Sequence, residues 1–206
     1  MEKVVGRDRA RRSAMSAERL DAARTCLLLF DFLVGHASKD PKRYAPVLAN
    51  AAKLLAAARG VGAMVAYARA DHRADGGTTA RTLHDSGPRS PLITSGTPEA
   101  EIVPELAPRP GEHLVPKHRW SAFHGTYLDL ALRSRHANTI VLCGGSTEIG
   151  VSSTAYAARD LDYNLVIASD ACTSAKHEVH DQLMREVFPR LARVRTTMQI
   201  LEMLKP

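Results

Sequence analysis

Apolar runs alternate with amphipathic stretches along most of the chain. Six short runs have the length and composition of strands that are buried on both faces. They cover residues 25–30, 61–67, 113–116, 139–143, 165–168 and 192–196. Helical spacing of apolar residues falls between them, at 41–59, 125–135, from 146 to about 160, at 176–188 and after 196. This alternation predicts an α/β fold, a three-layer α/β/α sandwich with a six-stranded, mostly parallel, doubly wound sheet.

A long polar segment at residues 68–98 breaks the alternation. It is rich in Gly, Ser, Thr and Pro and shows no periodicity. Loops of this length inside compact domains are often lids or substrate loops, so we expect the segment to shape a binding site. Short helical turns are expected at 17–23 and 100–106.

The length of 206 residues suits one globular domain with a sizeable core. We divide the chain into a basic N-terminal arm, residues 1–24, and a single domain, residues 25–206. No run of about 18 apolar residues exists, which argues against a membrane span, and the charged segment 6–12 is unlike a signal peptide. The three cysteines, Cys26, Cys143 and Cys172, lie far apart, which favours a reduced, cytoplasmic setting.

The formal net charge is +6, and residues 1–24 supply half of it, with seven Lys/Arg against four Asp/Glu. We interpret the arm as a solvated segment that can pack on a partner subunit. The other charges are mixed in sign and aromatic residues are few, so no nucleic-acid-binding stripe is predicted. A modest positive field suits a small anionic substrate.

Three predicted strand ends carry candidate chemistry. Asp31 directly follows the first apolar run, Lys117 ends the third, and the glycine-rich turn 144–151 follows the fourth. Because ligands of open α/β sheets bind beyond the carboxyl ends of the strands, we expect these three places to meet. A carboxyl group buried there can carry a proton, with a lysine as its partner. A helix cap and a surface salt bridge are the alternative roles for Asp31 and Lys117.

The glycines of the turn permit a backbone path that is closed to residues with a Cβ. Ser146 or Thr147 is predicted to cap the helix that follows. The first-turn amides of that helix would face the crevice above the strand end.

Together these motifs resemble the isochorismatase-like hydrolase superfamily, an α/β group that also holds nicotinamidases and N-carbamoyl amide hydrolases. The resemblance runs from about residue 25 to the C-terminus. It rests on the first strand that ends at Asp31, on 102–106, on 117–126, on the glycine-rich turn with 154–155, and on 170–171.

The chain departs from the superfamily at one informative position. Most members carry a cysteine nucleophile in the pattern Gly-Val-x-Thr-x-x-Cys-Val, and Gly150 stands at the cysteine position here. Thiolate catalysis needs sulfur at that place, so the usual acyl-enzyme route for amides is not available.

The isochorismatases proper are similar to this chain in having glycine there, and they hydrolyse a vinyl ether without a nucleophilic side chain. The resemblance implies that Asp31 is the general acid, that Lys117 holds and tunes it, and that Gly150 leaves room for substrate. It also implies a cis peptide between Gly145 and Ser146.

We expect the substrate to contact the turn and the segment after Lys117, through Gly145, Ser146, Ile149, Arg119, Trp120 and Phe123. Arg69, Arg73 or Arg119 could clamp a substrate carboxylate. The nicotinamidase branch binds zinc through an Asp-x-His pair, whereas Asp71 and His72 are adjacent here, so no metal and no cofactor are predicted.

The sequence thus predicts a cytoplasmic, cofactor-independent hydrolase that acts on a small anionic molecule, with vinyl-ether hydrolysis the leading hypothesis. Homo-oligomers are usual for the family, so we expect one here, with no nucleic-acid or membrane partner. A degenerate member that only binds a small molecule, or serves as an assembly subunit, is the first alternative. An amidase with a displaced nucleophile is the second, with Cys172 as its candidate because it is expected just past a strand end.

Overall fold

The computed structural model describes residues 18–85 and 93–205. Six strands form one sheet in the order β3-β2-β1-β4-β5-β6, and every pair of neighbours is parallel. The predicted doubly wound α/β sandwich is therefore confirmed. The strands are β1 (Thr25–Phe30), β2 (Met64–Ala70), β3 (His113–Lys117), β4 (Thr139–Gly145), β5 (Asn164–Thr173) and β6 (Arg193–Arg195).

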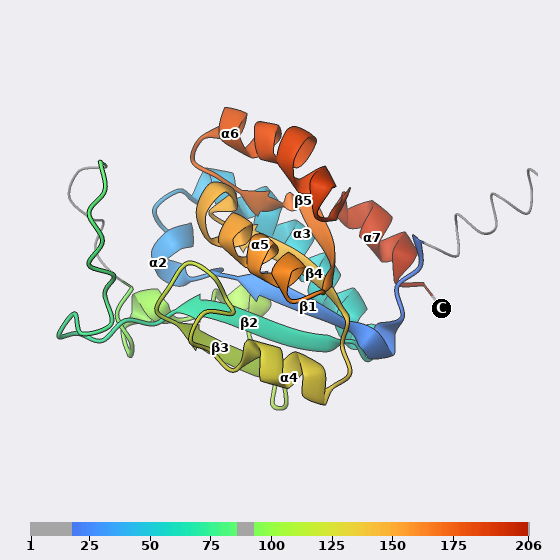
Figure 1. The fold of residues 1–206 in the computed structure, drawn as a ribbon, viewed down its shortest axis with the longest axis horizontal. Coiled ribbons are helices and arrows are strands. Elements are labelled where there is room, and N and C mark those ends of the chain that lie inside the picture. Colours follow the sequence, from blue (N-terminus) through green and yellow to red (C-terminus); the bar gives the residue numbers. More distant parts are fainter. Residues whose placement is uncertain (1–17, 86–92, 206) are drawn as a thin grey trace, which may run out of the picture.

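Helices connect the strands and cover both faces of the sheet (Figure 1). The α-helices are α2 (Val34–Ala37), α3 (Pro41–Gly60), α4 (Leu128–Ser134), α5 (Ser152–Asp160), α6 (His177–Gln182) and α7 (Thr197–Met203). The described segments also contain four short 3₁₀ helices, η1 (Ala22–Arg24), η2 (Pro98–Ala100), η3 (Pro104–Leu106) and η6 (Phe188–Arg190). Two π-helical turns, η4 (Thr147–Val151) and η5 (Leu183–Val187), precede α5 and follow α6.

The two faces of β1 separate the two helical layers. Leu27 packs with Leu54 of α3, whereas the ring of Phe30 meets Gly150 of η4. Side chains of opposite parity point to opposite faces of a strand, so α3 and α5 lie on opposite sides of the sheet. In Figure 1, α5 crosses in front of the sheet and α3 lies behind it.

Several boundaries differ from the predicted ones. Val61 does not begin β2, because its amide closes α3 on the carbonyl of Ala57, and Gly62, at φ 73°, turns the chain out of the helix. The predicted helix 125–135 is shorter in the structure, where α4 begins at Leu128, and its Leu130 is 69% exposed. The predicted 176–188 helix divides into α6, η5 and η6.

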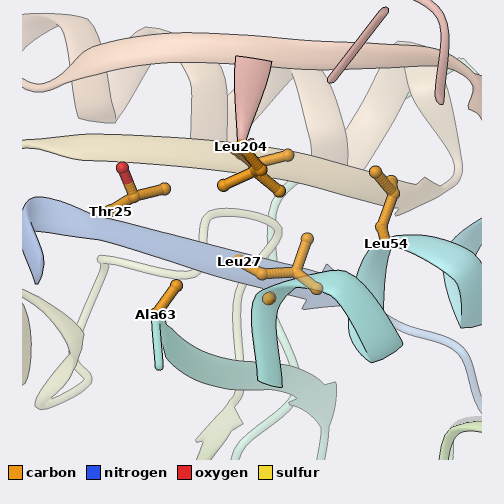
Figure 2. Close-up of a pocket in the computed structure, with 7 residues that line it drawn as sticks. Thr25, Leu27, Leu54, Ala63 and Leu204 are labelled. Carbon is orange, nitrogen blue, oxygen red and sulfur yellow. The ribbon is translucent and has the colours of Figure 1, made fainter. Parts of the chain in front are cut away.

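A small apolar gap lies between the sheet, α3 and the end of α7 (Figure 2). Thr25, Leu27 and Ala63 line it near the amino ends of β1 and β2. It has no charged lining residue, and Asp31 lies at the other end of β1. The gap is therefore part of core packing and not a candidate active site.

Within the described segments, no helix has the length and apolar character needed to cross a bilayer. Most of the predicted basic arm, residues 1–17, lies outside the described residues, as do 86–92 of the predicted substrate loop. The predicted helix at 17–23 is represented by the 3₁₀ turn η1.

Candidate active site

Asp31 and Lys117 form one buried ion pair at the carboxyl edge of the sheet. Asp31 follows β1, Lys117 ends β3, and β2 lies between them. The Lys117 ammonium donates to Asp31 Oδ2 at 2.8 Å, and the Ala70 amide donates to Asp31 Oδ1 at 2.7 Å. The residues are 7% and 4% exposed. The expected meeting of the two groups is confirmed, and neither the surface-salt-bridge nor the helix-cap role applies.

Local backbone geometry aims the carboxylate across β2. Asp31 has a φ of 52°, in the left-handed region that aspartate tolerates better than most residues. Its amide still donates to Ala68 of β2 at 2.8 Å, so the turn begins while the strand is held. Lys117 stands opposite Ala70 in the β2–β3 register, which places its side chain next to the same β2 end.

The glycine-rich turn packs against the end of β1. The peptide between Gly145 and Ser146 is cis, as the resemblance implied. Gly144 has a φ of 143°, and a Cβ there would lie 2.1 Å from the carbonyl oxygen of Phe30. Glycine at this position therefore allows β4 to approach β1.

The predicted capping role of Ser146 or Thr147 is wrong. Ser146 makes no capping side-chain hydrogen bond, because the chain enters α5 through the π-helical turn η4. The Thr147 hydroxyl instead contacts His180 Nδ1 at 2.9 Å, and Ser152 donates to the Thr147 carbonyl. Burial lowers the pKa of His180, which favours the neutral ring. No pattern in the sequence links His180 of α6 to this turn.

The space beside Gly150 is occupied by protein. A Cβ at position 150 would lie 2.2 Å from Cε1 and 2.4 Å from Cζ of Phe30. The expectation that Gly150 leaves room for substrate is therefore wrong, because the Phe30 ring fills that room. Phe30 is not among the site residues predicted from the sequence, although a large residue before Asp31 together with glycine at 150 is a signal of complementary sizes.

The six residues predicted to contact the substrate differ in burial and in their neighbours. Gly145 is buried against Tyr44 and Thr173, and Phe123 stacks on Tyr163 with ring centroids 5.8 Å apart. Three side chains are exposed, those of Ile149 (39%), Trp120 (68%) and Arg119. Ser146 is intermediate in exposure. The part of these six residues in substrate binding stays a prediction.

The three candidate arginines do not converge on the ion pair. Arg69 pairs with Pro116 in the β2–β3 register, and Lys117 is the next residue of β3. Because successive side chains of a strand point to opposite faces, the Arg69 side chain lies on the face of the sheet opposite to that of Lys117. Arg73 pairs with Asp75 on the surface. Arg119 donates to the Thr78 and His118 carbonyls and thereby ties the loop after β2 to the end of β3. Arg119 contacts Lys117 through its backbone, because its carbonyl oxygen accepts from Lys117 Nζ at 3.5 Å.

The cysteines are poor nucleophiles. Cys172 lies inside β5, which extends to Thr173, and it is 4% exposed, so its expected place past the strand end is wrong. Burial raises the pKa of Cys26 and of Cys172 to about 12, and that of Cys143 well above its ordinary value. A thiol with such a pKa is almost never ionised at neutral pH.

Within residues 18–85 and 93–205, no three His, Cys, Asp or Glu side chains come together in a group that could hold a metal ion. His72 Nδ1 lies 3.3 Å from the Thr78 hydroxyl, and His84 is exposed.

Comparison with known proteins identifies relatives along most of the chain. Residues 25–199 match the family model of the isochorismatase domain. The isochorismatase family protein YwoC of Bacillus subtilis is 34% identical over 191 residues, which cover 93% of this chain and 100% of YwoC. The ureidoacrylate amidohydrolase RutB of Rhizobium rhizogenes is 35% identical over 138 residues, which cover 60% of this chain and 56% of RutB. The structure of an isochorismatase family protein from Burkholderia thailandensis superposes with a TM-score of 0.84 at 31% identity, covering 91% of this chain and 98% of that one.

Proposed function

Because the chain belongs to the isochorismatase family of hydrolases, we propose that it hydrolyses a small anionic vinyl ether by proton transfer through Asp31 and Lys117, without a thiol nucleophile. The observation that carries the proposal is the buried Asp31–Lys117 pair beside Gly150, which carries no thiol and where the Phe30 ring fills the place of a Cβ. A vinyl ether suits such a site, because protonation of its carbon makes it reactive toward water.

The proton path begins at the ion pair. A proton passes from Lys117 to Asp31 Oδ2 and on to the terminal carbon of the vinyl ether, which leaves an oxocarbenium cation. Water adds to that cation, and the proton that the water loses returns to the pair. The hemiketal then collapses to a ketone and an alcohol. Burial of both groups excludes bulk water and strengthens their electrostatic interaction with the cation.

Two features support an anionic substrate. The net charge of the chain is +6, and the exposed Arg119 follows the end of β3, where the charge of Lys117 is already compensated by Asp31. A positive field of this kind favours the approach of small anions.

Amide hydrolysis is the second candidate, because RutB, a relative, is named an amidohydrolase. The burial and raised pKa of all three cysteines weigh against a thiol route to that reaction.

The test is a substrate panel in two arms. Pyruvate release is measured from isochorismate and small vinyl ethers, and ammonia release from ureidoacrylate and simple amides. Each arm includes Asp31→Asn, with Asp160→Asn as a control because Asp160 is an exposed carboxylate at the end of α5.

Asp31-dependent pyruvate release is the expected result. Asp31-dependent ammonia release would contradict the vinyl-ether proposal in favour of an amidase. No turnover in either arm would favour a family member that only binds a small molecule.

A further inference from the structure

The Phe30 ring occupies the place of the side chain that position 150 lacks. Phe30 closes β1 and is 0% exposed, and its Cε1 and Cζ atoms lie within 2.4 Å of where a Cβ of residue 150 would stand. Real Cβ atoms essentially never approach another heavy atom that closely. The two residues are therefore complementary in volume.

The same ring also contacts Lys117. The Lys117 ammonium lies 4.4 Å from the centroid of the Phe30 ring, within the range of a cation–π interaction. Its other contacts are Asp31 Oδ2 at 2.8 Å and the Arg119 carbonyl at 3.5 Å. The ring therefore supports one side of the ammonium while the carboxylate holds another.

The backbone of Phe30 is held in place and cannot shift to carry the ring away from position 150. The Phe30 carbonyl packs against Gly144, where a Cβ would lie only 2.1 Å from the oxygen. Phe30 is also paired on both sides, with Ala68 of β2 and Gly144 of β4. A group added at position 150 must therefore displace the ring within a packed core.

We propose that Phe30 is a positioning residue that replaces the missing nucleophile: its ring closes the position beside Gly150 and holds the Lys117 ammonium against Asp31. Water is then the nucleophile, and substrates that require a covalent acyl intermediate are excluded. The inference rests on the proposed function only for its kinetic readout.

The proposed packing of Phe30 against Gly150 is tested by thermal unfolding of the parent protein, Gly150→Ala, Phe30→Leu and the double variant. Gly150 has no positive φ, so Gly150→Ala in a helical turn would ordinarily raise the melting temperature. Beside Phe30 it is expected to lower Tm by about 3–10 °C, the cost of overpacking in a chain of this size. Phe30→Leu removes Cε1 and Cζ, so in that background Gly150→Ala is expected to leave Tm unchanged or raise it.

Gly60→Ala is the matched control, because nothing lies within 4 Å of a Cβ at Gly60 and its effect should not depend on residue 30. Equal effects of Gly150→Ala in both backgrounds would overturn the inference. This measurement requires no substrate, so its failure is distinguishable from failure of the proposed function.

The proposed role of Phe30 in holding the Lys117 ammonium is tested by the chemical reactivity of Lys117. Acetylation by acetic anhydride, mapped by mass spectrometry, is expected to be several-fold faster at Lys117 in Phe30→Leu, while the exposed Lys53 is unchanged. In the Asp31-dependent reaction, Phe30→Leu is expected to lower kcat roughly 10-fold with KM nearly unchanged.

Phe188→Leu is the control for both readouts, because it removes another fully buried ring outside the site. An unchanged acetylation rate and an unchanged kcat in Phe30→Leu would overturn the positioning role. Equal losses in Phe30→Leu and Phe188→Leu would also overturn it, because they would reflect core damage alone.

Discussion

Lys117 contacts Asp31 at 2.8 Å across the end of β2, and the two side chains are only 5% and 9% exposed. Two opposite charges this deeply buried each lose most of their hydration, and each depends on the other for compensation. The pair is therefore important for the stability of the fold, and it is the group that we propose transfers the proton.

Removal of the acid should abolish turnover while the fold is retained. Asp31→Asn keeps an acceptor for the Ala70 amide but cannot carry a proton. We expect kcat/KM for the Asp31-dependent reaction to fall by about 10²–10⁴-fold, the usual contribution of general acid–base catalysis. Steady-state kinetics measure the loss, and a native far-UV circular dichroism spectrum establishes the fold. Activity within threefold of the parent protein would exclude Asp31 as the proton carrier.

Removal of only the lysine should destabilise the protein strongly. Lys117→Met leaves the buried Asp31 carboxylate without its partner and is expected to cost about 3–5 kcal/mol of unfolding free energy. The double change Asp31→Asn with Lys117→Met removes both charges, so it should cost less than the two single changes added together. Urea denaturation of the four proteins gives the coupling. Additive effects would mean that the pair contributes no interaction energy.

The native thiols should be unreactive. With a pKa of about 12, only about one thiol in ten thousand of Cys26 or Cys172 is ionised at pH 8, and all three side chains are buried. Ellman's reagent is expected to label none of the cysteines in the native protein and all three in urea. Cys172→Ala should retain full activity. Rapid labelling of native Cys172 together with inactivation would revive the displaced-nucleophile alternative.

Glu112, a half-buried carboxylate, should contribute to the acid sensitivity of the fold. Burial by itself would raise the pKa of Glu112, but hydrogen bonds from the Arg59 guanidinium, the Arg109 amide and the Tyr67 hydroxyl bring it below its ordinary value. A pKa that is lower in the folded state stabilises the protein above the unfolded-state pKa, and this stabilisation is lost as the pH falls through the folded-state pKa.

Glu112→Gln is therefore expected to cost about 1–3 kcal/mol at pH 7, and less near pH 3. Urea denaturation at both pH values measures the difference, and Glu105→Gln, on an exposed residue of η3, is the control. A cost that is the same at both pH values would contradict this account.

The sequence alone determined the order of the secondary-structure elements and the strand ends that carry the candidate catalytic residues. Hydrophobic periodicity identified all six strands, and placed Asp31 and Lys117 at the carboxyl ends of two of them. Periodicity is a local property, so the sequence carries it directly. The sequence also shows directly that position 150 is glycine and not cysteine, because this depends only on residue identity.

Only the tertiary structure decided which groups meet. The strand order places β2 between β1 and β3, and so brings together two residues that lie 86 positions apart. The tertiary structure also places Arg69 on the opposite face of the sheet from Lys117 and includes Cys172 within β5. It positions the Phe30 ring beside Gly150 and Lys117. These outcomes depend on register, strand length and side-chain volume across the sheet. Such contacts form between segments distant in the chain, and no local pattern of residues specifies them.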